Sequence, residues 1–247
     1  MNKRSAWVAR NRNELFHSIS AGFLTLTIDD EHIKYTDSGF PTLDYKELQK
    51  FFKRLRKKYG KGIKYFACGE YGSKSFRPHF HALIYNLPIL TNGKDFFEFY
   101  RKRIEEIWKL GIVSFSEVIE PRIGYITKYI IKTNEEKKLY EENQIERPRL
   151  LVSRGIGSHL LEKSNALGRH NSDYGKPFQL PRYVLEKIKR NDKQRYYEIL
   201  RKRKQYHDYL AKRELSEFPT KAEYLSKLEF ERRETIRKLK LSKNHQL

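Results

Sequence analysis

Two histidines one residue apart constrain this chain more than any other feature of its sequence. His79 and His81 lie inside an apolar, β-prone run that ends at Tyr85. Because side chains alternate along a strand, both imidazoles project from one face and Phe80 projects from the other. One face of this strand therefore packs into a core, and the other offers two imidazoles to a single metal ion. The alternative is a pair of polar residues on an exposed strand face.

A carboxylate precedes the histidines at a distance that suits a hairpin. Residues 63–68 favour a strand, which ends at the segment 69–72 that contains Glu70. If this strand pairs with the histidine strand, Glu70 returns beside His79 and His81. Two imidazoles and one carboxylate suit a divalent ion that keeps open positions for a substrate oxygen. Alternatively, Glu70 is a surface carboxylate at a turn.

A second group of polar side chains lies on a helix that Pro121 opens. Tyr125 and Tyr129 are four residues apart, about 40° around the helix, and each has a lysine three residues later, Lys128 and Lys132. The opposite side of the helix gathers three isoleucines, Ile123, Ile126 and Ile130. Neighbouring ammonium groups favour phenolate over a phenol whose free pKa is about 10, and they would also bind phosphate. The alternative is an ordinary amphipathic helix whose tyrosines pack at the edge of the core.

The charge of the chain indicates a polyanionic partner. Its 52 Lys and Arg residues against 31 Asp and Glu give a formal net charge of +21, which favours nucleic acid or an acidic membrane surface. No apolar run reaches the roughly 18 residues of a membrane-spanning helix. The single cysteine, Cys68, excludes an internal disulfide or a cysteine-cluster zinc site, and it suggests a reducing, cytosolic setting. The absence of a P-loop motif argues against a built-in helicase.

The remaining pattern predicts an α+β fold followed by a basic helical extension. Strands are expected at 23–28 and 112–118, helices at 45–59 and 95–109, and a charged loop at 133–148. Asp44 is the expected N-cap of the first of these helices and Gly60 its C-cap. Residues 182–247 carry 20 Lys and Arg, 10 Asp and Glu and no glycine, and they read as two helical segments broken near Pro219. We expect one domain at 1–185 and a tail at 186–247.

Four segments in a fixed order resemble a known family. They are Phe-Leu-Thr-Leu-Thr at 23–27, Cys-Gly-Glu-Tyr-Gly-Ser-Lys at 68–74, Arg-Pro-His-Phe-His-Ala at 77–82 and Tyr-x-x-Lys-Tyr-x-x-Lys at 125–132. Each motif alone is common, but the combination resembles the rolling-circle replication initiators of gokushovirus-type single-stranded DNA phages (Microviridae), which belong to the HUH endonucleases. The resemblance covers roughly residues 20 to 185.

The resemblance implies a fold and a reaction. The fold is a central antiparallel β-sheet with flanking helices, with the histidines on a middle strand and the tyrosine helix beside it. In the reaction, a tyrosine attacks a phosphate of single-stranded origin DNA, the enzyme keeps the 5′ end as a phosphotyrosine ester, and a 3′-OH is freed for the host polymerase. Mg²⁺ or Mn²⁺ would polarise the phosphate, and rejoining would need no ATP.

Residue by residue, the resemblance maps onto this chain as follows. His79 and His81 match the metal ligands of the family, and Glu70 stands where related initiators place a third, acidic ligand. Tyr129 and Tyr125 match its paired nucleophiles. Two tyrosines allow the second to attack a regenerated origin while the first still holds the 5′ end. The family also implies a host helicase as a partner, in the bacterial cytoplasm.

Two other classes of function remain open from sequence. Another HUH enzyme, such as a plasmid initiator, a relaxase or a transposase, would keep the nicking chemistry and change the substrate. A non-catalytic basic nucleic-acid-binding protein would carry the histidines and tyrosines incidentally. Within the nicking hypothesis, the lysine spacing predicts that Tyr129, which shares its helix face with Lys132, makes the first covalent bond and Tyr125 the second.

Overall fold

A computed structural model describes residues 3–90, 95–128, 137–161, 169–171 and 177–244 of the 247-residue chain. The described residues up to Lys187 form one compact unit, and those from Ile188 onward form another. The strands are β1 (Ala21–Leu26), β2 (Lys34–Tyr35), β3 (Pro41–Thr42), β4 (Lys64–Tyr71), β5 (Pro78–Tyr85), β6 (Val113–Ser116), β7 (Leu150–Val152), β8 (Arg169–Asn171) and β9 (Pro177–Gln179). The helices are α1 (Lys3–His17), α2 (Tyr45–Tyr59), α3 (Phe96–Trp108), α4 (Glu120–Lys128), α5 (Lys137–Glu142), α6 (Arg182–Asn191), α7 (Lys193–Ser216) and α8 (Lys221–Asn244), with 3-10 turns at Asp30–His32 and Ser158–Leu161.

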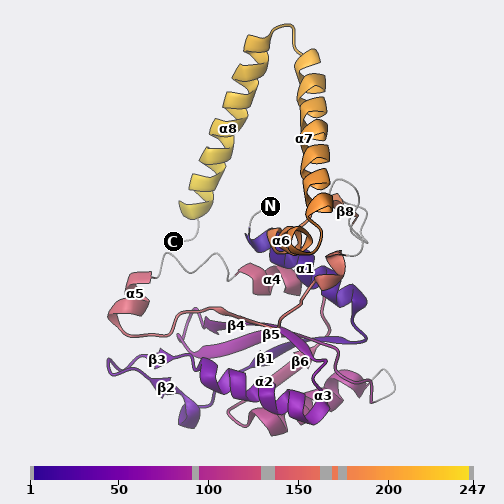
Figure 1. The fold of residues 1–247 in the computed structure, drawn as a ribbon. Helices are drawn as coiled ribbons and strands as arrows, with labels where there is room; N and C mark the ends of the chain where they lie inside the picture. Colours follow the sequence, from indigo (N-terminus) through magenta and orange to yellow (C-terminus); the bar gives the residue numbers. More distant parts are fainter. Residues whose placement is uncertain (1–2, 91–94, 129–136, 162–168, 172–176, 245–247) are drawn as a thin grey trace. The chain divides into compact units, whose positions relative to one another are not determined.

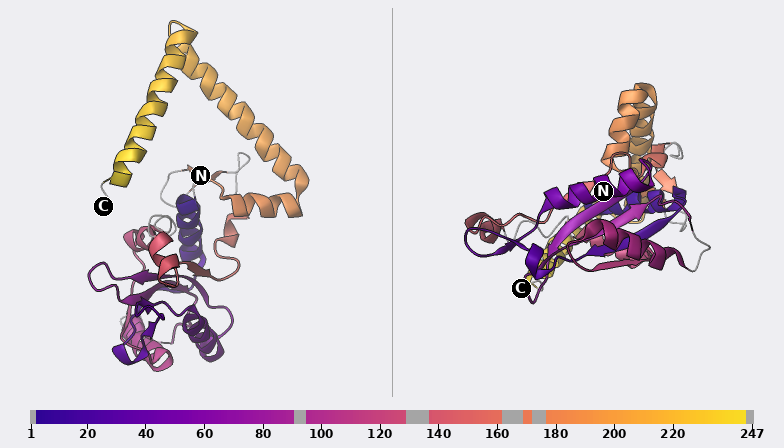
Figure 2. Two further views of the ribbon diagram at one scale, coloured as in Figure 1. Left: turned by 90° about the vertical axis from the view of Figure 1, so that its left-hand side faces the viewer. Right: turned by 90° about the horizontal axis from the view of Figure 1, so that it is seen from below.

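A five-stranded sheet in the order β6-β1-β5-β4-β7 forms the centre of the first unit. All its neighbouring strands pair antiparallel. In Figure 1, helices α2 and α3 cover one face of the sheet, and α1 and α4 cover the other. The right panel of Figure 2 looks onto the face that α2 and α3 cover. The expected α+β fold with a central antiparallel sheet is thus confirmed, and the histidine strand β5 is its middle strand.

Alternation along β5 divides its side chains between two cores. Phe80, Ala82 and Ile84 pack with α2 and α3 in the larger core. Leu83 and Tyr85 pack on the other side with isoleucines of α4. His79 and His81 therefore share their face of the sheet with α4, and the predicted separation of the histidines from Phe80 is confirmed.

The β4–β5 hairpin fixes which residues meet across the two strands. Its register places Glu70 opposite His79. The connecting turn is closed by two backbone hydrogen bonds, from Gly72 N–H to the Arg77 carbonyl (3.0 Å) and from Phe76 N–H to the Gly72 carbonyl (2.8 Å). Phe76 adopts a left-handed φ of 54° while its ring stacks on Tyr71 at 4.5 Å. That stacking offsets the strain of a positive φ at a bulky residue.

Helix α2 forms as its sequence predicts. Asp44 accepts hydrogen bonds from the backbone N–H groups of Lys46 and Glu47, which would otherwise have no partner at the helix start. Gly60, with a φ of 112°, ends the helix, and its N–H donates to the Arg56 carbonyl. The buried stripe of α2 consists of Leu48, Phe51, Phe52 and Leu55, all at most 1% exposed. The cap and the stripe together place α2 on the sheet face opposite the histidines.

Three details of the sequence interpretation need correction. Strand β4 continues to Tyr71 rather than ending at residue 68, so Glu70 lies inside the strand. Residues 133–148 are not all loop, because α5 forms around the buried Tyr140, whose ring packs near Tyr71 at 5.9 Å. The region after residue 182 contains three helices rather than two, because Asp192 caps a new helix and accepts from Arg195 N–H. The break near Pro219 is present as expected.

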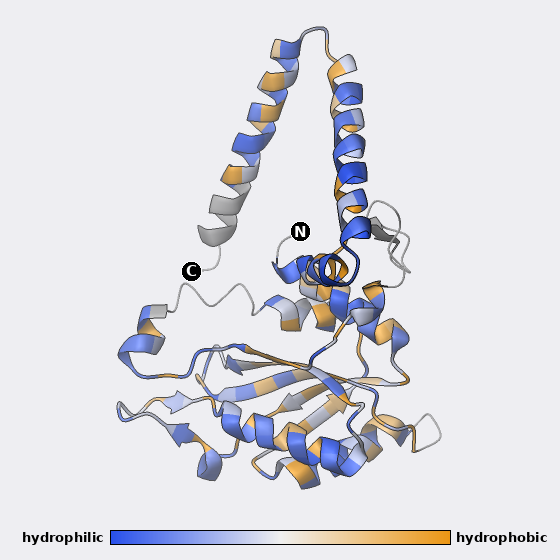
Figure 3. Cartoon of the chain, in the orientation of Figure 1, coloured by the Kyte–Doolittle hydropathy of each residue, from blue (hydrophilic) through white to orange (hydrophobic). Residues whose placement is uncertain are grey.

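The second unit consists of the end of α6 and the long helices α7 and α8. Figure 3 shows both long helices as mostly hydrophilic, with scattered apolar residues such as the exposed Tyr209 and Phe230. Within the described part of the chain, no helix has the length and the apolar character that crossing a membrane requires.

Candidate metal and tyrosine site

Three side chains converge where β4 and β5 pair. The Nε2 atom of His81 lies 3.1 Å from Oε2 of Glu70, and the Nε2 atom of His79 lies 3.4 Å from the same oxygen. Ligand atoms of all three residues fall within 4.8 Å of one another. The structure thus brings together the three residues that the sequence predicts as metal ligands. They form the one such cluster of His, Cys, Asp and Glu side chains found among the described residues.

The orientation of His81 suits a cation better than a hydrogen bond. Its Nε2 is buried and has no aligned hydrogen-bond partner in the described structure, although Glu70 is only 3.1 Å away. A buried nitrogen without a partner is costly unless something else satisfies it. The donor set of two imidazole nitrogens and one carboxylate oxygen fits a divalent cation. A metal ion among these atoms would satisfy Nε2.

The protonation of the site follows from its burial and charge. Burial lowers the pKa of His79, but its hydrogen bonds to Glu70 and to the Arg77 carbonyl, together with the Glu70 charge, outweigh burial and raise that pKa overall. Cys68, which lies opposite His81 on β4, is buried, and burial together with the nearby Glu70 charge raises the pKa of its thiol. Cys68 is therefore a neutral thiol and not a competing thiolate ligand.

Helix α4 brings one of the two predicted tyrosines to this cluster. The Tyr125 hydroxyl donates a hydrogen bond of 2.9 Å to Oε2 of Glu70. Its ring also packs edge-on against His81, with centroids 5.4 Å apart. Tyr125 remains 39% exposed, so a large substrate can reach its hydroxyl. Lys128 follows on the same helix and is exposed, whereas Tyr129 and Lys132 lie outside the described residues.

Packing against the sheet and against α1 holds α4 in place. Ile123 and Ile126 are fully buried on the side of α4 that packs on β4 and β5, as the sequence predicts, and Ile130 lies beyond the described residues. From α1, Arg12 pairs with Glu120, and Arg4 donates to the Gly124 carbonyl (3.2 Å). These contacts with α1 orient the helix that carries Tyr125.

Strand β1 supplies residues that the sequence interpretation missed. Thr25 lies opposite His81 in the register, and its hydroxyl is 3.0 Å from Nδ1 of His81. Phe23, two residues earlier on the same face, stacks on the His81 ring at a centroid distance of 5.5 Å. The alternation in Phe-Leu-Thr-Leu-Thr places Phe23 and Thr25 on one face. No short-range signal, however, pairs β1 with a strand more than fifty residues away.

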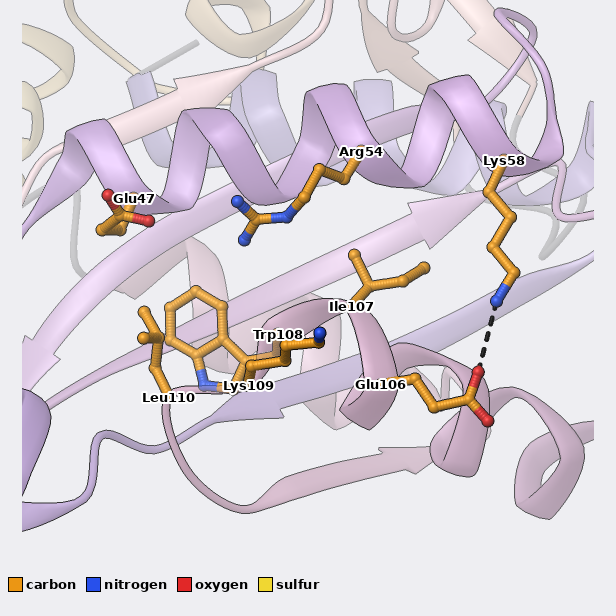
Figure 4. A pocket seen from close by; sticks show the side chains of 8 residues that line it. All are labelled: Glu47, Arg54, Lys58, Glu106, Ile107, Trp108, Lys109 and Leu110. Atoms are coloured by element: carbon orange, nitrogen blue, oxygen red, sulfur yellow. Dashed lines mark hydrogen bonds and ion pairs between the residues drawn. The ribbon is translucent and has the colours of Figure 1, made fainter.

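A separate concavity lies on the opposite face of the sheet. It opens between α2 and α3, has a volume of about 420 Å³, and is drawn in Figure 4. Trp108 and Leu110 contribute apolar surface, and Arg54 and Lys58 contribute positive charge, with Lys58 paired to Glu106 at 3.3 Å. None of the predicted catalytic or metal-binding residues lines it. The chemistry of the site therefore does not depend on this pocket.

Comparisons with known proteins agree with the features of the chain. The family model for the replication-associated protein ORF2 matches residues 21–134. The chain is 31% identical over 192 residues to replication-associated protein ORF2 of Spiroplasma virus 4, covering 71% of this chain and 60% of the relative. It is 26% identical over 226 residues to replication-associated protein VP4 of Bdellovibrio phage phiMH2K, covering 82% of this chain and 67% of the relative.

A third relative matches a shorter stretch. The chain is 35% identical over 123 residues to replication-associated protein ORF4 of Chlamydia phage 1, which is 44% of this chain and 30% of the relative. The chain thus spans less than two thirds of the length of two of these three relatives. No solved structure matches the chain.

Proposed function

Because this chain belongs to the replication-associated proteins of gokushovirus-type phages, we propose that it initiates replication by nicking single-stranded origin DNA. The proposed reaction forms a 5′-phosphotyrosine intermediate and a free 3′-OH, and it later rejoins the strands. The observation that carries the proposal is the contact of the Tyr125 hydroxyl with Glu70, at the oxygen that both histidines face. A phenol at a metal-suited cluster supports covalent phosphodiester chemistry better than DNA binding alone.

His79, His81 and Glu70 are the residues that would hold the metal, Mg²⁺ or Mn²⁺. Once bound, the ion would supply Lewis-acid polarisation of the scissile phosphate. The fit rests on the orphaned Nε2 of His81 and on the donor set described above. The cluster lies at a strand pair in the middle of the sheet, where a rigid scaffold limits its movement.

The protein's own residues account for the proton and for the leaving group. The Tyr125 oxygen forms a bond to phosphorus as the bond from phosphorus to the 3′ oxygen breaks. Glu70, already the acceptor of the Tyr125 hydrogen bond, takes the phenol proton. The departing 3′ oxygen gains a proton from solvent and leaves as a hydroxyl. One phosphoester bond replaces another, so the reverse reaction reseals the strand without an external energy source.

A second tyrosine extends the reaction to a complete replication cycle. Tyr129 would attack the regenerated origin while Tyr125 still holds the first 5′ end, or the two would act in the opposite order. Lys128 and Lys132, each three residues after a tyrosine, would stabilise phenolate or bind the substrate phosphate. The roles of Tyr129 and Lys132 rest on the sequence, since both lie outside the described residues.

The charge of the protein supports DNA as the substrate. A net charge of +21 favours a polyanion, and the described helices include no membrane span. Residues 186–247 would bind the DNA backbone or a partner without contributing to the chemistry, while residues 1–185 carry the nicking site. A host helicase and a host polymerase are the partners that a nicked origin would require, in the cytoplasm of the bacterial host.

A covalent-adduct assay tests the proposal. Single-stranded oligonucleotides that tile the genome carrying this gene are labelled at the 3′ end and incubated with protein and Mn²⁺. We expect one tile to transfer its label to the protein as a band that survives denaturation, because the fragment downstream of the nick stays on tyrosine. The same tile labelled at its 5′ end should release a shorter, protein-free fragment.

The controls separate the competing functions. Chelation of the metal should abolish the adduct, and the double variant Tyr125→Phe/Tyr129→Phe should form none while still binding DNA. Binding of every tile without any adduct would instead indicate a non-catalytic DNA-binding protein. An adduct only with plasmid or transposon end sequences would indicate a relaxase or a transposase.

A further inference from the structure

The two nitrogens of the His81 ring have different surroundings. Nδ1 lies 3.0 Å from the Thr25 hydroxyl. Nε2 points into the cluster, 3.1 Å from Oε2 of Glu70, and has no aligned hydrogen-bond partner among the described residues. A neutral imidazole carries its hydrogen on one nitrogen and a lone pair on the other. The ring nitrogen that carries the hydrogen therefore decides whether His81 can act as a ligand.

Only one of the two tautomers suits metal binding through Nε2. With the hydrogen on Nδ1, that nitrogen donates to Thr25 and leaves the Nε2 lone pair facing the cluster. With the hydrogen on Nε2, Thr25 must donate to Nδ1, and a buried N–H then lacks an aligned acceptor. Metal-bound histidines in proteins are generally oriented in this way, by an acceptor for their second ring nitrogen.

His79 reaches the same arrangement through a backbone group. Its Nδ1 lies 3.1 Å from the Arg77 carbonyl, which can only accept, so the hydrogen of neutral His79 is on Nδ1 and its Nε2 is free to face Glu70. The Thr25 hydroxyl does not dictate a direction in this way, since a hydroxyl can donate or accept. The two histidines thus differ in how firmly their tautomers are set.

Packing restricts the His81 ring to one plane. Phe23 stacks on one side of it, 5.5 Å away and tilted by 23°, and Tyr125 approaches edge-on at 5.4 Å. The Arg122 guanidinium lies 5.3 Å from the centre of the Phe23 ring and donates to Ser116 Oγ (2.8 Å), which holds Phe23 in turn. Because the ring does not need to turn, the hydrogen bond to Thr25 acts only on the position of the hydrogen.

We propose that Thr25 is a positioning residue that keeps the His81 hydrogen on Nδ1, so that Nε2 faces Glu70 as the ligand of a divalent cation. The inference rests on the proposed metal-dependent function. Thr25 contacts neither DNA nor the metal in this role and acts only through His81. Of the two Nδ1 acceptors, it alone is a side chain, so it alone can be removed by substitution.

Two substitutions at Thr25 and one matched control test the proposal. Thr25→Val keeps the shape and the β-branched character of the side chain but removes its oxygen, whereas Thr25→Ser keeps the oxygen. Thr27→Val is the control, because Thr27 follows β1 and bonds to the backbone of Ile112 rather than to a histidine. Comparing the melting temperatures of the two valine variants shows how much stability each substitution removes.

Two measurements on the full chain provide the readouts. Calorimetric titration with Mn²⁺ should show affinity reduced about 10- to 100-fold in Thr25→Val, the usual effect of losing such a partner, and near wild type in Thr25→Ser and Thr27→Val. Nitrogen-15 NMR of the metal-free protein, at a pH where the histidines are neutral, should place the His81 hydrogen on Nδ1 in wild type and Thr25→Ser. In Thr25→Val it should show a mixture or a hydrogen on Nε2.

The outcomes distinguish this inference from the function beneath it. If wild type binds no Mn²⁺, the metal-dependent function is wrong and the positioning role is wrong with it. If wild type binds Mn²⁺ through His79 and His81 but Thr25→Val binds it equally well, only the role of Thr25 is wrong. An unchanged tautomer in Thr25→Val would overturn the role of Thr25 in the same way.

Discussion

The hydroxyl of Tyr125 donates a hydrogen bond of 2.9 Å to Glu70, the carboxylate that also faces both histidines. This contact joins an element from residues 120–128 to a hairpin about fifty residues earlier, and it places a nucleophile at a proton acceptor. It supports Tyr125 for the first covalent step, the opposite of the order that the lysine spacing predicts.

The identity of the first nucleophile can be tested with single substitutions. Tyr125→Phe removes the hydroxyl but keeps the ring that packs on His81. We therefore expect this variant to fold normally and to lose the first-turnover adduct. Tyr129→Phe should form that adduct and fail only at strand transfer. Peptide mapping of the adduct decides the order, and DNA found on Tyr129 in the first turnover would restore the order predicted from the sequence.

Removal of the histidines should stop nicking without unfolding the protein. His79→Ala and His81→Ala each delete one ligand of the cluster, whereas the sheet is held mainly by the core residues on its two faces. We expect loss of the adduct with a nearly unchanged circular dichroism spectrum. Nicking at the wild-type rate by the double alanine variant would end the metal hypothesis. Glu70→Ala should weaken Mn²⁺ binding, and a titration identical to wild type would show that another acid is the third ligand.

The raised pKa of His79 predicts the pH dependence of metal binding. A protonated imidazole cannot bind a metal, and the pKa of His79 lies above its ordinary value of about 6.5. Metal affinity should therefore begin to fall at a higher pH, on acidification, than it would for an ordinary histidine. Glu70→Gln removes the charge that raises this pKa, so its affinity, although weaker, should start to fall at a lower pH. Titrations at a series of pH values measure both midpoints.

The same shift has an opposite consequence for the stability of the metal-free protein. A histidine whose pKa is raised on folding stabilises the folded state while it is protonated. That contribution is present below the pKa of the unfolded chain and is lost as pH rises through the folded-state pKa. Urea denaturation without metal should therefore show a larger contribution of His79 at low pH, measured as the difference between wild type and His79→Ala. A difference that does not change with pH would contradict the pairing with Glu70.

The tail should determine how DNA affinity responds to salt. Each phosphate that a Lys or Arg neutralises adds roughly 0.7 to 0.9 to the logarithmic slope of affinity against salt. Truncation after Asn191 keeps α6 and removes α7 and α8, so both affinity and slope should decrease. A milder variant replaces Arg201, Lys202, Arg203 and Lys204 by glutamine, which has a similar helix propensity. If the slope stays unchanged in both variants, the tail contacts a protein and not DNA.

A buried carboxylate of α1 should contribute strongly to stability although it lies outside the site. Glu14 is 1% exposed, pairs with Lys64 at 2.7 Å and accepts from Gly157 N–H at 2.9 Å. Glu14→Ala leaves these donors without their partner, and breaking a buried pair in this way costs about 3–5 kcal/mol. Urea denaturation measures the loss. The exposed Glu98, which pairs with Arg101 on α3, is the matched control and should change stability little when replaced by alanine.

Local sequence rules were sufficient where one element carries its own signal. Helix α2 has a cap at Asp44, a stop at Gly60 and an apolar stripe between them, and its bounds match the prediction. The hairpin was also predictable, because Glu70 and the histidines alternate on neighbouring strands joined by a short turn. The fold class and the cluster of Glu70, His79 and His81 both follow from such short-range patterns.

What the sequence did not reveal depends on contacts between distant segments. Helix α1 buries Arg10, Asn11, Asn13 and Glu14, so its inward face does not look apolar. The contact of Thr25 with His81 depends on the pairing of β1 with β5, which no neighbouring residue encodes. Helix α5 is charged apart from a few apolar residues, and the buried Tyr140 stacks on a ring that is distant in sequence. In each case a tertiary contact outweighs the local pattern.

The closed turn between β4 and β5 also bears on how this protein can change over generations. A shift of one residue in a β-pair moves every side chain of the strand to the other face, so one inserted or deleted residue between Tyr71 and Pro78 would separate Glu70 from both histidines. Single substitutions in the turn carry no such penalty, provided that the backbone bonds of Gly72 and the stacking of Phe76 survive. We therefore expect descendants to vary the letters of this turn while inheriting its length.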